Sequence, residues 1–145
     1  MSLFSSYLKK EAKALRDDNV RLKVIGNRTH FSDRLKALIS DTETMTANGN
    51  LCLYLCVDYG GRWDIANTAK KMATEVQMGR LRPSDIDEQV FAKYMLDDGI
   101  PDPDLCIRTA GEKRLSNFLL WQLAYSVLYF ADCYWPDFDS KALEM

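Results

Sequence analysis

Apolar positions along the chain alternate between helical spacing and short continuous runs. The helical spacing predicts five helices, over about residues 3–15, 33–48, 64–78, 85–96 and 116–126. The continuous runs, rich in β-branched residues or bounded by turn residues, predict strands over residues 20–26, 51–59, 104–108 and 128–133. Strands and helices that alternate in this way are typical of an α/β fold with a mainly parallel sheet flanked by helices.

Two local patterns add detail to the predicted helices and strands. Ser32 directly precedes the second helix, so its hydroxyl is expected to cap the first turn. The strand at residues 51–59 is almost entirely apolar, which favours a strand buried on both faces, as in a parallel sheet.

Composition limits the class of protein. The 145 residues, 47% of them apolar, suffice for one domain or part of one, because domains commonly span roughly 100–200 residues. The net charge of −2 gives no indication of a nucleic-acid partner, so any anion site must be local. No apolar stretch reaches the roughly 18 residues of a membrane-spanning helix. The cysteines lack paired metal-ligand spacing and are expected to be free thiols in a reducing cytoplasm: Cys52, Cys56, Cys106 and Cys133.

Glycine and arginine come together at the carboxyl ends of two predicted strands, where α/β sheets bind ligands. One segment is "YGGR", residues 59–62, and the other is "RTAGEKRLS", residues 108–116. Glycine lets backbone N–H groups approach a ligand, arginine offers a fork of donors, and Ser116 adds a hydroxyl at a helix start. The pattern indicates a phosphate or diphosphate site. The alternative, left open by the residues, is that each arginine only pairs with a neighbouring acid such as Glu112 or Asp64. His30 is expected at the surface.

Longer motifs support a resemblance. The run "PDLCIRTAGEKRLSNFLLWQLAYSVLYF", continued by "WPDF" to residue 138, closely resembles the carboxyl-terminal signature of the cis-prenyltransferases, the undecaprenyl diphosphate synthase family. "LYLCVDYGGRWDI" (53–65) and "VRLKVIGNRTHFSDRL" (20–35) are similar to preceding segments of that family. The resemblance implies that residues 1–145 are the carboxyl-terminal part of a single cis-prenyltransferase domain, with the amino-terminal strands of the family fold missing.

The resemblance also implies an activity. Such enzymes condense isopentenyl diphosphate onto an allylic diphosphate with cis geometry, and make the lipid carrier of cell-wall synthesis. Arg108, Arg114 and Ser116 match the residues that hold the isopentenyl diphosphate head, and the backbone of Leu115 could contribute. Lys113 could add charge to this site or point to solvent. A cytoplasmic enzyme is expected, with a product that partitions to the membrane and no nucleic-acid partner.

Metal binding and assembly are implied in the same way. The family uses Mg2+ at the diphosphates, but Val127 stands where most active relatives have Glu, and valine has no oxygen ligand to offer. The catalytic Asp of the family belongs to an amino-terminal "MDGNGRWA"-like motif that these residues do not contain. We therefore expect neither a catalytic nor a metal-ligating residue in this chain, and no activity of the chain alone. The alternatives are a non-catalytic partner subunit and a diphosphate-binding module. The apolar segment at residues 117–130 is expected to form a homodimer contact anchored by Trp121.

Overall fold

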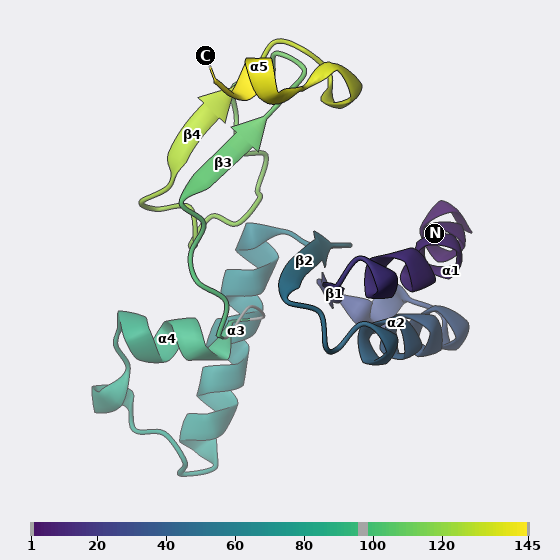
Figure 1. Cartoon of the computed structure of the whole chain (residues 1–145). Coiled ribbons are helices and arrows are strands. Elements are labelled where there is room, and N and C mark those ends of the chain that lie inside the picture. The colour runs from purple at the N-terminus through teal and green to yellow at the C-terminus, as the bar shows by residue number, and fades with distance from the viewer. Residues whose placement is uncertain (1, 96–98, 145) are drawn as a thin grey trace. The chain divides into compact units, whose positions relative to one another are not determined.

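The computed structural model describes residues 2–95 and 99–144. The chain divides into two compact units, Met1–Tyr59 and Gly60–Met145. Each unit has its own pair of parallel strands and its own helices (Figure 1). The expected α/β class with parallel strands is therefore confirmed.

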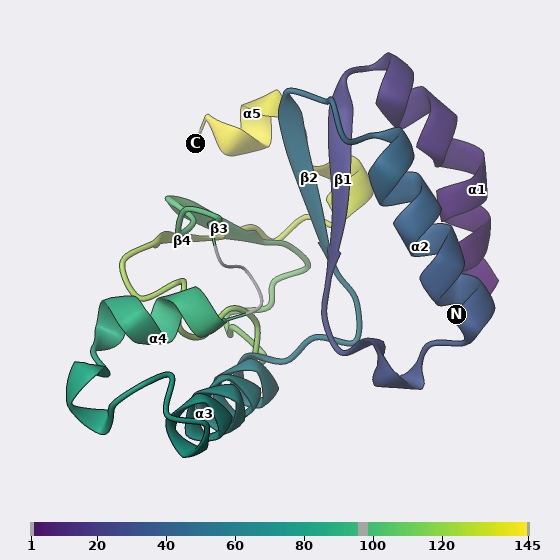
Figure 2. The ribbon, with the colours of Figure 1, turned by 90° about the horizontal axis from the view of Figure 1, so that it is seen from below.

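The first unit follows the predicted alternation closely. Its elements are α1 (Ser2–Asp17), β1 (Val20–Ile25), α2 (Asp33–Met45) and β2 (Leu51–Cys56). β1 and β2 are parallel, in register from Val20 opposite Leu51 to Ile25 opposite Cys56. Helices α1 and α2 lie side by side and both contact β1 (Figure 2). The apolar residues at helical spacing form the buried cluster together with β1: Leu8, Leu22, Val24, Phe31, Leu35 and Ile39.

Side chains of α2 satisfy the backbone of β1. The N–H of Leu22 donates to Thr46 Oγ1 at 3.0 Å, and the N–H of Val24 donates to Glu43 Oε1 at 2.9 Å. These bonds matter because an unpaired backbone N–H in a buried strand is costly. Ser32 caps α2 as expected, since its Oγ accepts a hydrogen bond from the N–H of Leu35 at 3.3 Å.

The structure also tests the predictions for His30 and for the cysteines. The side chain of His30 is 78% exposed and lies 3.1 Å from Asp58, which confirms its surface position. All four cysteines are free, as expected, although each is only partly buried. Among the residues that the structure describes, no helix combines the length and hydrophobicity needed to cross a bilayer.

The second unit contains the candidate site. Its elements are α3 (Gly61–Gln77), α4 (Glu88–Tyr94), β3 (Leu105–Arg108), β4 (Val127–Phe130) and the short α5 (Ser140–Leu143). β3 and β4 are parallel, in register from Leu105 opposite Val127 to Arg108 opposite Phe130. The end predicted for α4, at residue 96, lies outside the described residues.

The helix predicted over residues 116–126 does not form. These residues make a succession of turns, and Ser116, Asn117 and Leu119 have φ values of 49°, 65° and 43°. A right-handed helix requires negative φ, so three such residues within four positions exclude it. The apolar segment is instead a folded loop between β3 and β4. Its Trp121 ring stacks on Phe91 of α4, with the ring centroids 4.6 Å apart.

Candidate functional site

Arg108 is the last residue of β3 and opens the loop. Its carbonyl accepts a hydrogen bond from the N–H of Ala131 at 2.8 Å, which fixes its backbone beside β4. The residue is half-buried and lines a cavity of about 370 Å³. The other lining residues come from β3, from the loop and from one aromatic beyond β4: Cys106, Ile107, Thr109, Ala110, Glu112, Leu115, Phe118 and Trp135. Within the described part of the chain, Arg108 makes no ion pair.

Arg114 differs from Arg108 in having an acidic partner. Its Nε lies 2.8 Å from Glu112 Oε2, and its side chain is 71% exposed. The alternative left open by the sequence, pairing with a neighbouring acid, is therefore realised for Arg114. Leu115 lines the same cavity as Arg108, while Lys113 and Ser116 are exposed. The four predicted site residues thus share one loop, but only Arg108 and Leu115 line its cavity.

The backbone of the glycine turn is already occupied. The N–H of Ala110 donates to the carbonyl of Cys133 at 2.7 Å, and the N–H of Gly111 donates to that of Ala131 at 3.0 Å. The expectation that these N–H groups approach a ligand is wrong for both. The expected helix start at Ser116 is wrong too, because no helix follows it. An anion in this loop is therefore not bound by the N–H groups of Ala110 and Gly111, nor by a helix that starts at Ser116.

Asn117 connects the two glycine and arginine segments. Its carbonyl accepts a hydrogen bond from the N–H of Gly61 at 2.6 Å, and its side-chain Oδ1 accepts one from the N–H of Arg62 at 2.9 Å. These are donors of the first turn of α3, which have no partner within the helix. The sequence reasoning did not single out Asn117. Its residue type was the available signal, because Asn both caps helices and tolerates positive φ.

Gly61 allows this contact to be close. A Cβ on Gly61 would lie 2.7 Å from Leu120 Cγ and 2.9 Å from Leu120 N, closer than packed atoms approach. The loop therefore rests directly on the first turn of α3. Gln122 and Leu123, two and three residues after Leu120, are buried. Packing thus holds a loop whose left-handed residues cost about 1–2 kcal/mol each, as is common at ligand clamps.

The comparisons with known proteins show the family of the chain. The family model described as "Putative undecaprenyl diphosphate synthase" matches residues 1–145, the whole chain. The chain belongs to the cis-prenyltransferase family.

Individual relatives match over nearly the whole of this chain. It is 49% identical over 144 residues to a ditrans,polycis-undecaprenyl-diphosphate synthase of Pseudomonas putida, described as (2E,6E)-farnesyl-diphosphate specific; the match covers 99% of the chain and 57% of that relative. It is 47% identical over 145 residues to an isoprenyl transferase of Neisseria meningitidis; that match covers 99% of this chain and 56% of the relative. The chain therefore spans little more than half the length of these curated relatives.

A solved structure shows the fold of the family. The crystal structure of lavandulyl diphosphate synthase from Lavandula x intermedia, in complex with dimethylallyl diphosphate, matches with a TM-score of 0.91 at 38% identity. That match covers 99% of this chain and 63% of the solved chain. Its agreement supports the α/β assignment made from the hydrophobic pattern.

Val127 does not fit the Mg2+-ligand role that the family resemblance implies for its position. Val127, at the implied ligand position, is the first residue of β4, and its hydrocarbon side chain has no oxygen to donate. In residues 2–95 and 99–144, no group of three or more His, Cys, Asp or Glu side chains could hold a metal ion. We therefore derive no chemical step through a metal bound by these residues.

Proposed function

We propose that this chain supplies the isopentenyl diphosphate-binding part of a prenyltransferase similar to undecaprenyl diphosphate synthase. The enzyme would condense isopentenyl diphosphate onto an allylic diphosphate with cis geometry. Arg108 is the observation that carries the proposal. The residue is half-buried, lines a cavity and makes no ion pair among the described residues. Such a group gains from a diphosphate because charge-assisted, forked hydrogen bonds are strong.

Each predicted residue has a distinct part in this binding. Arg108 would hold the diphosphate with its fork of donors, and Ser116 would donate its hydroxyl. Arg114 would exchange Glu112 for the diphosphate, since both are anions within reach of one exposed side chain. Leu115 would form the apolar wall on which the isopentenyl group rests. These residues bind and orient the nucleophilic substrate, and ionisation of the allylic partner would depend on other residues.

The substrate class is supported by the names of relatives. The Pseudomonas putida relative is described as specific for farnesyl diphosphate, and the lavandulyl diphosphate synthase was solved with dimethylallyl diphosphate. Both ligands are allylic diphosphates. We propose the same class here, in a cytoplasmic enzyme whose long product partitions to the membrane.

A non-catalytic role is the second candidate, and Val127 favours it. If Mg2+ is needed where most active relatives carry Glu, a chain with Val127 binds the substrate without completing the metal site. We therefore propose that the 145-residue chain alone does not condense the two diphosphates. Incorporation of labelled isopentenyl diphosphate above a protein-free control would contradict this. Co-purification with a full-length homologue would favour a partner subunit.

Assembly through residues 117–130 is also part of the proposal. Tyr125, Val127 and Leu128 are large exposed residues within this segment, and a second copy of the chain would remove apolar surface of this kind from water. We propose a homodimer whose contact includes them. Trp121 is not a free anchor for that contact, because its ring already packs on Phe91.

Calorimetric titration of isopentenyl diphosphate tests the binding role. Arg108→Gln should weaken binding about tenfold or more, because a hydrogen bond to a charged group contributes roughly 1.5–3 kcal/mol. Arg82→Gln is the matched control, since Arg82 is an arginine of the same unit that pairs with Asp85 away from the loop. Equal affinity of the Arg108→Gln variant and the unmodified chain would overturn the proposal.

A further inference from the structure

Helices α1 and α2 flank an open cavity that the proposed prenyltransferase site does not use. Its volume is about 540 Å³, and its lining comes from both helices and from the cap of α2. The lining residues that matter here are Ser5 and Lys9 of α1, and Ser32, Arg34, Leu35 and Leu38. All of them belong to the first unit, Met1–Tyr59.

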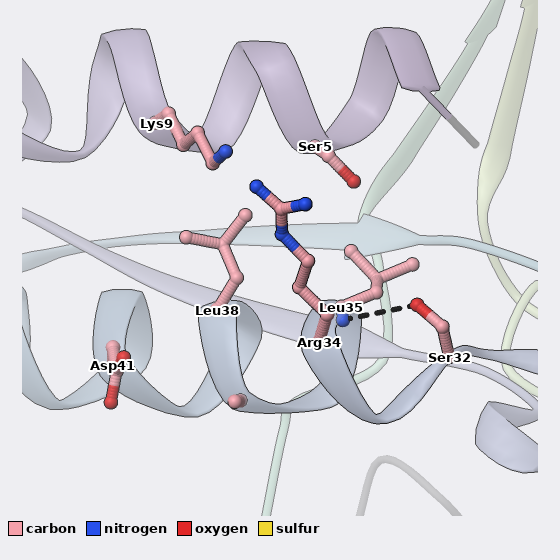
Figure 3. Close-up of a pocket in the computed structure, with 8 residues that line it drawn as sticks. Ser5, Lys9, Ser32, Arg34, Leu35, Leu38 and Asp41 are labelled. Carbon is pink, nitrogen blue, oxygen red and sulfur yellow. Dashed lines mark hydrogen bonds between the residues drawn. The ribbon is translucent and has the colours of Figure 1, made fainter.

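Two cations face each other across this cavity. The ammonium group of Lys9 and the guanidinium group of Arg34 point into the space between the helices (Figure 3). Neither makes an ion pair with any described residue. Like charges held close together repel each other, and an anion between them would replace that repulsion with attraction.

Neighbouring lysines on the same helices behave differently. Lys10 lies 3.9 Å from Glu11, and Lys36 lies 3.7 Å from Asp33. The side chain of Ser32 caps the N–H of Leu35 in the first turn of α2, and the carbonyl of Ser32 accepts the N–H of Lys36. The feature that distinguishes this cavity is therefore the pair of cationic side chains, Lys9 and Arg34, rather than the start of α2.

The apolar residues of the lining indicate which group the ligand would carry besides its anionic group. Leu35 is buried and Leu38 is half-buried, and both side chains rise toward the same space (Figure 3). Leu38 offers the accessible apolar surface next to the cationic pair, since Leu35 is only 3% exposed. Asp41 lies seven residues after Arg34, about 10 Å further along α2 at 1.5 Å per residue. Its carboxylate would disfavour a second anionic group at that end.

We propose that the cavity between α1 and α2 binds a phosphate monoester that carries a short apolar chain. The dianionic phosphate lies between Lys9 and Arg34, where two cations match its charge. The apolar chain lies over Leu38 toward the far end of the cavity. This chemistry has two sources, a soluble alkyl phosphate and the headgroup of phosphatidic acid in a bilayer.

Hexyl phosphate is the soluble probe, added to the 145-residue chain and followed by amide chemical-shift changes in NMR. We expect shifts at Ser5, Lys9 and Arg34. The double variant Lys9→Gln, Arg34→Gln should weaken binding about tenfold, since it removes both charges that match the phosphate. Lys10→Gln with Lys36→Gln is the matched control, which removes the same charge from the same helices and should leave binding unchanged. Both pairs replace exposed side chains, so the fold is not at risk.

Vesicles distinguish the two sources. Cosedimentation with vesicles containing phosphatidic acid, absent with phosphatidylcholine and lost in the Lys9→Gln, Arg34→Gln variant, supports the lipid headgroup. Binding of hexyl phosphate without such cosedimentation supports the soluble ester. The proposal is overturned if hexyl phosphate shifts only residues 108–118, or if the double variant binds as tightly as its control. Inorganic phosphate binding as tightly as hexyl phosphate would overturn the part assigned to Leu38.

Discussion

The N–H of Arg62 donates a hydrogen bond to Oδ1 of Asn117, at 2.9 Å and across 55 residues of sequence. Asn117 lies in the loop that follows Arg108 and contains Arg114, and its side chain satisfies a backbone donor in the first turn of α3. We expect Asn117→Gly to lower the free energy of unfolding by about 1–2 kcal/mol, since it removes the acceptor and loosens the unfolded chain. Asn117→Asp should cost less, because it keeps an acceptor at the same place. Urea unfolding measures both.

The control for this prediction is Asn48→Gly. Asn48 is an exposed residue of the turn after α2, so its variant reports the general effect of an added glycine. If Asn117→Gly were no less stable than Asn48→Gly, the contact with α3 would have no energetic role. Asn117→Ala should be the most destabilised of the series, because φ is 65° at this position and a Cβ of alanine disfavours that conformation.

The same contact explains why the sequence predicted some elements and not others. The helices and strands of the first unit carry their own signals, such as the cap at Ser32 and the helical spacing of Leu35 and Ile39, and they form close to their predicted positions. The expectation that the strand starting at Leu51 is buried on both faces is wrong, because Leu51 is exposed and the rest of β2 is only half-buried. Residues 116–126 carry an equally apolar pattern but form turns. The deciding interactions are between Asn117 and α3 and between Trp121 and Phe91, far apart in sequence. A local pattern contains no information about such partners.

The candidate site, like the fold, could be predicted from the sequence only in part. The chemistry of Arg108 and the turn at Ala110 and Gly111 follow from residue type, and the structure has both at the end of β3. The use of the N–H groups of Ala110 and Gly111 could not be predicted, because their acceptors, Cys133 and Ala131, lie beyond the next strand. Residue type therefore indicates the ligand class, while the list of available donors requires the fold.

Glu112 is expected to compete with the diphosphate for Arg114. The two side chains are 2.8 Å apart and largely exposed, so the ion pair itself is worth no more than about 1 kcal/mol. Glu112→Gln should tighten isopentenyl diphosphate binding about two- to fivefold, because it frees Arg114 and removes a like charge from the site. Calorimetric titration measures the change, with Glu88→Gln on α4 as the control. Unchanged binding in both Glu112→Gln and Arg114→Gln would mean that Arg114 serves only its ion pair.

Glu75 gives the second unit a pH-dependent contact. Two hydrogen bonds from Arg80, at 2.7 and 2.6 Å, lower the pKa of the Glu75 carboxyl below its ordinary value of 4.5. Because the folded-state pKa is depressed, the stabilisation is present above the unfolded pKa and disappears as pH falls through the folded value. We expect Glu75→Gln to lower the urea midpoint at pH 7 and to match the unmodified chain at strongly acidic pH. A gap between the two that persists in acid would contradict this account, and Glu144→Gln near the chain end is the control.

The homodimer is best tested at the exposed residues of the loop and of β4. Tyr125 is 97% exposed and Leu128 is 44% exposed, whereas Trp121 is half-buried and its ring contacts Phe91. If residues 117–130 form the contact, Tyr125→Ser with Leu128→Ser should raise the dimer dissociation constant at least about tenfold, since central aromatic residues dominate interfaces. Tyr134→Ser is the matched control, because Tyr134 is an exposed aromatic outside this segment. Sedimentation equilibrium measures the constants. The dimer would be contradicted if the unmodified chain sedimented as a 16.6 kDa monomer at micromolar concentration. If the Tyr134→Ser variant dissociated and the double variant at Tyr125 and Leu128 did not, the contact would instead lie in the carboxyl-terminal segment.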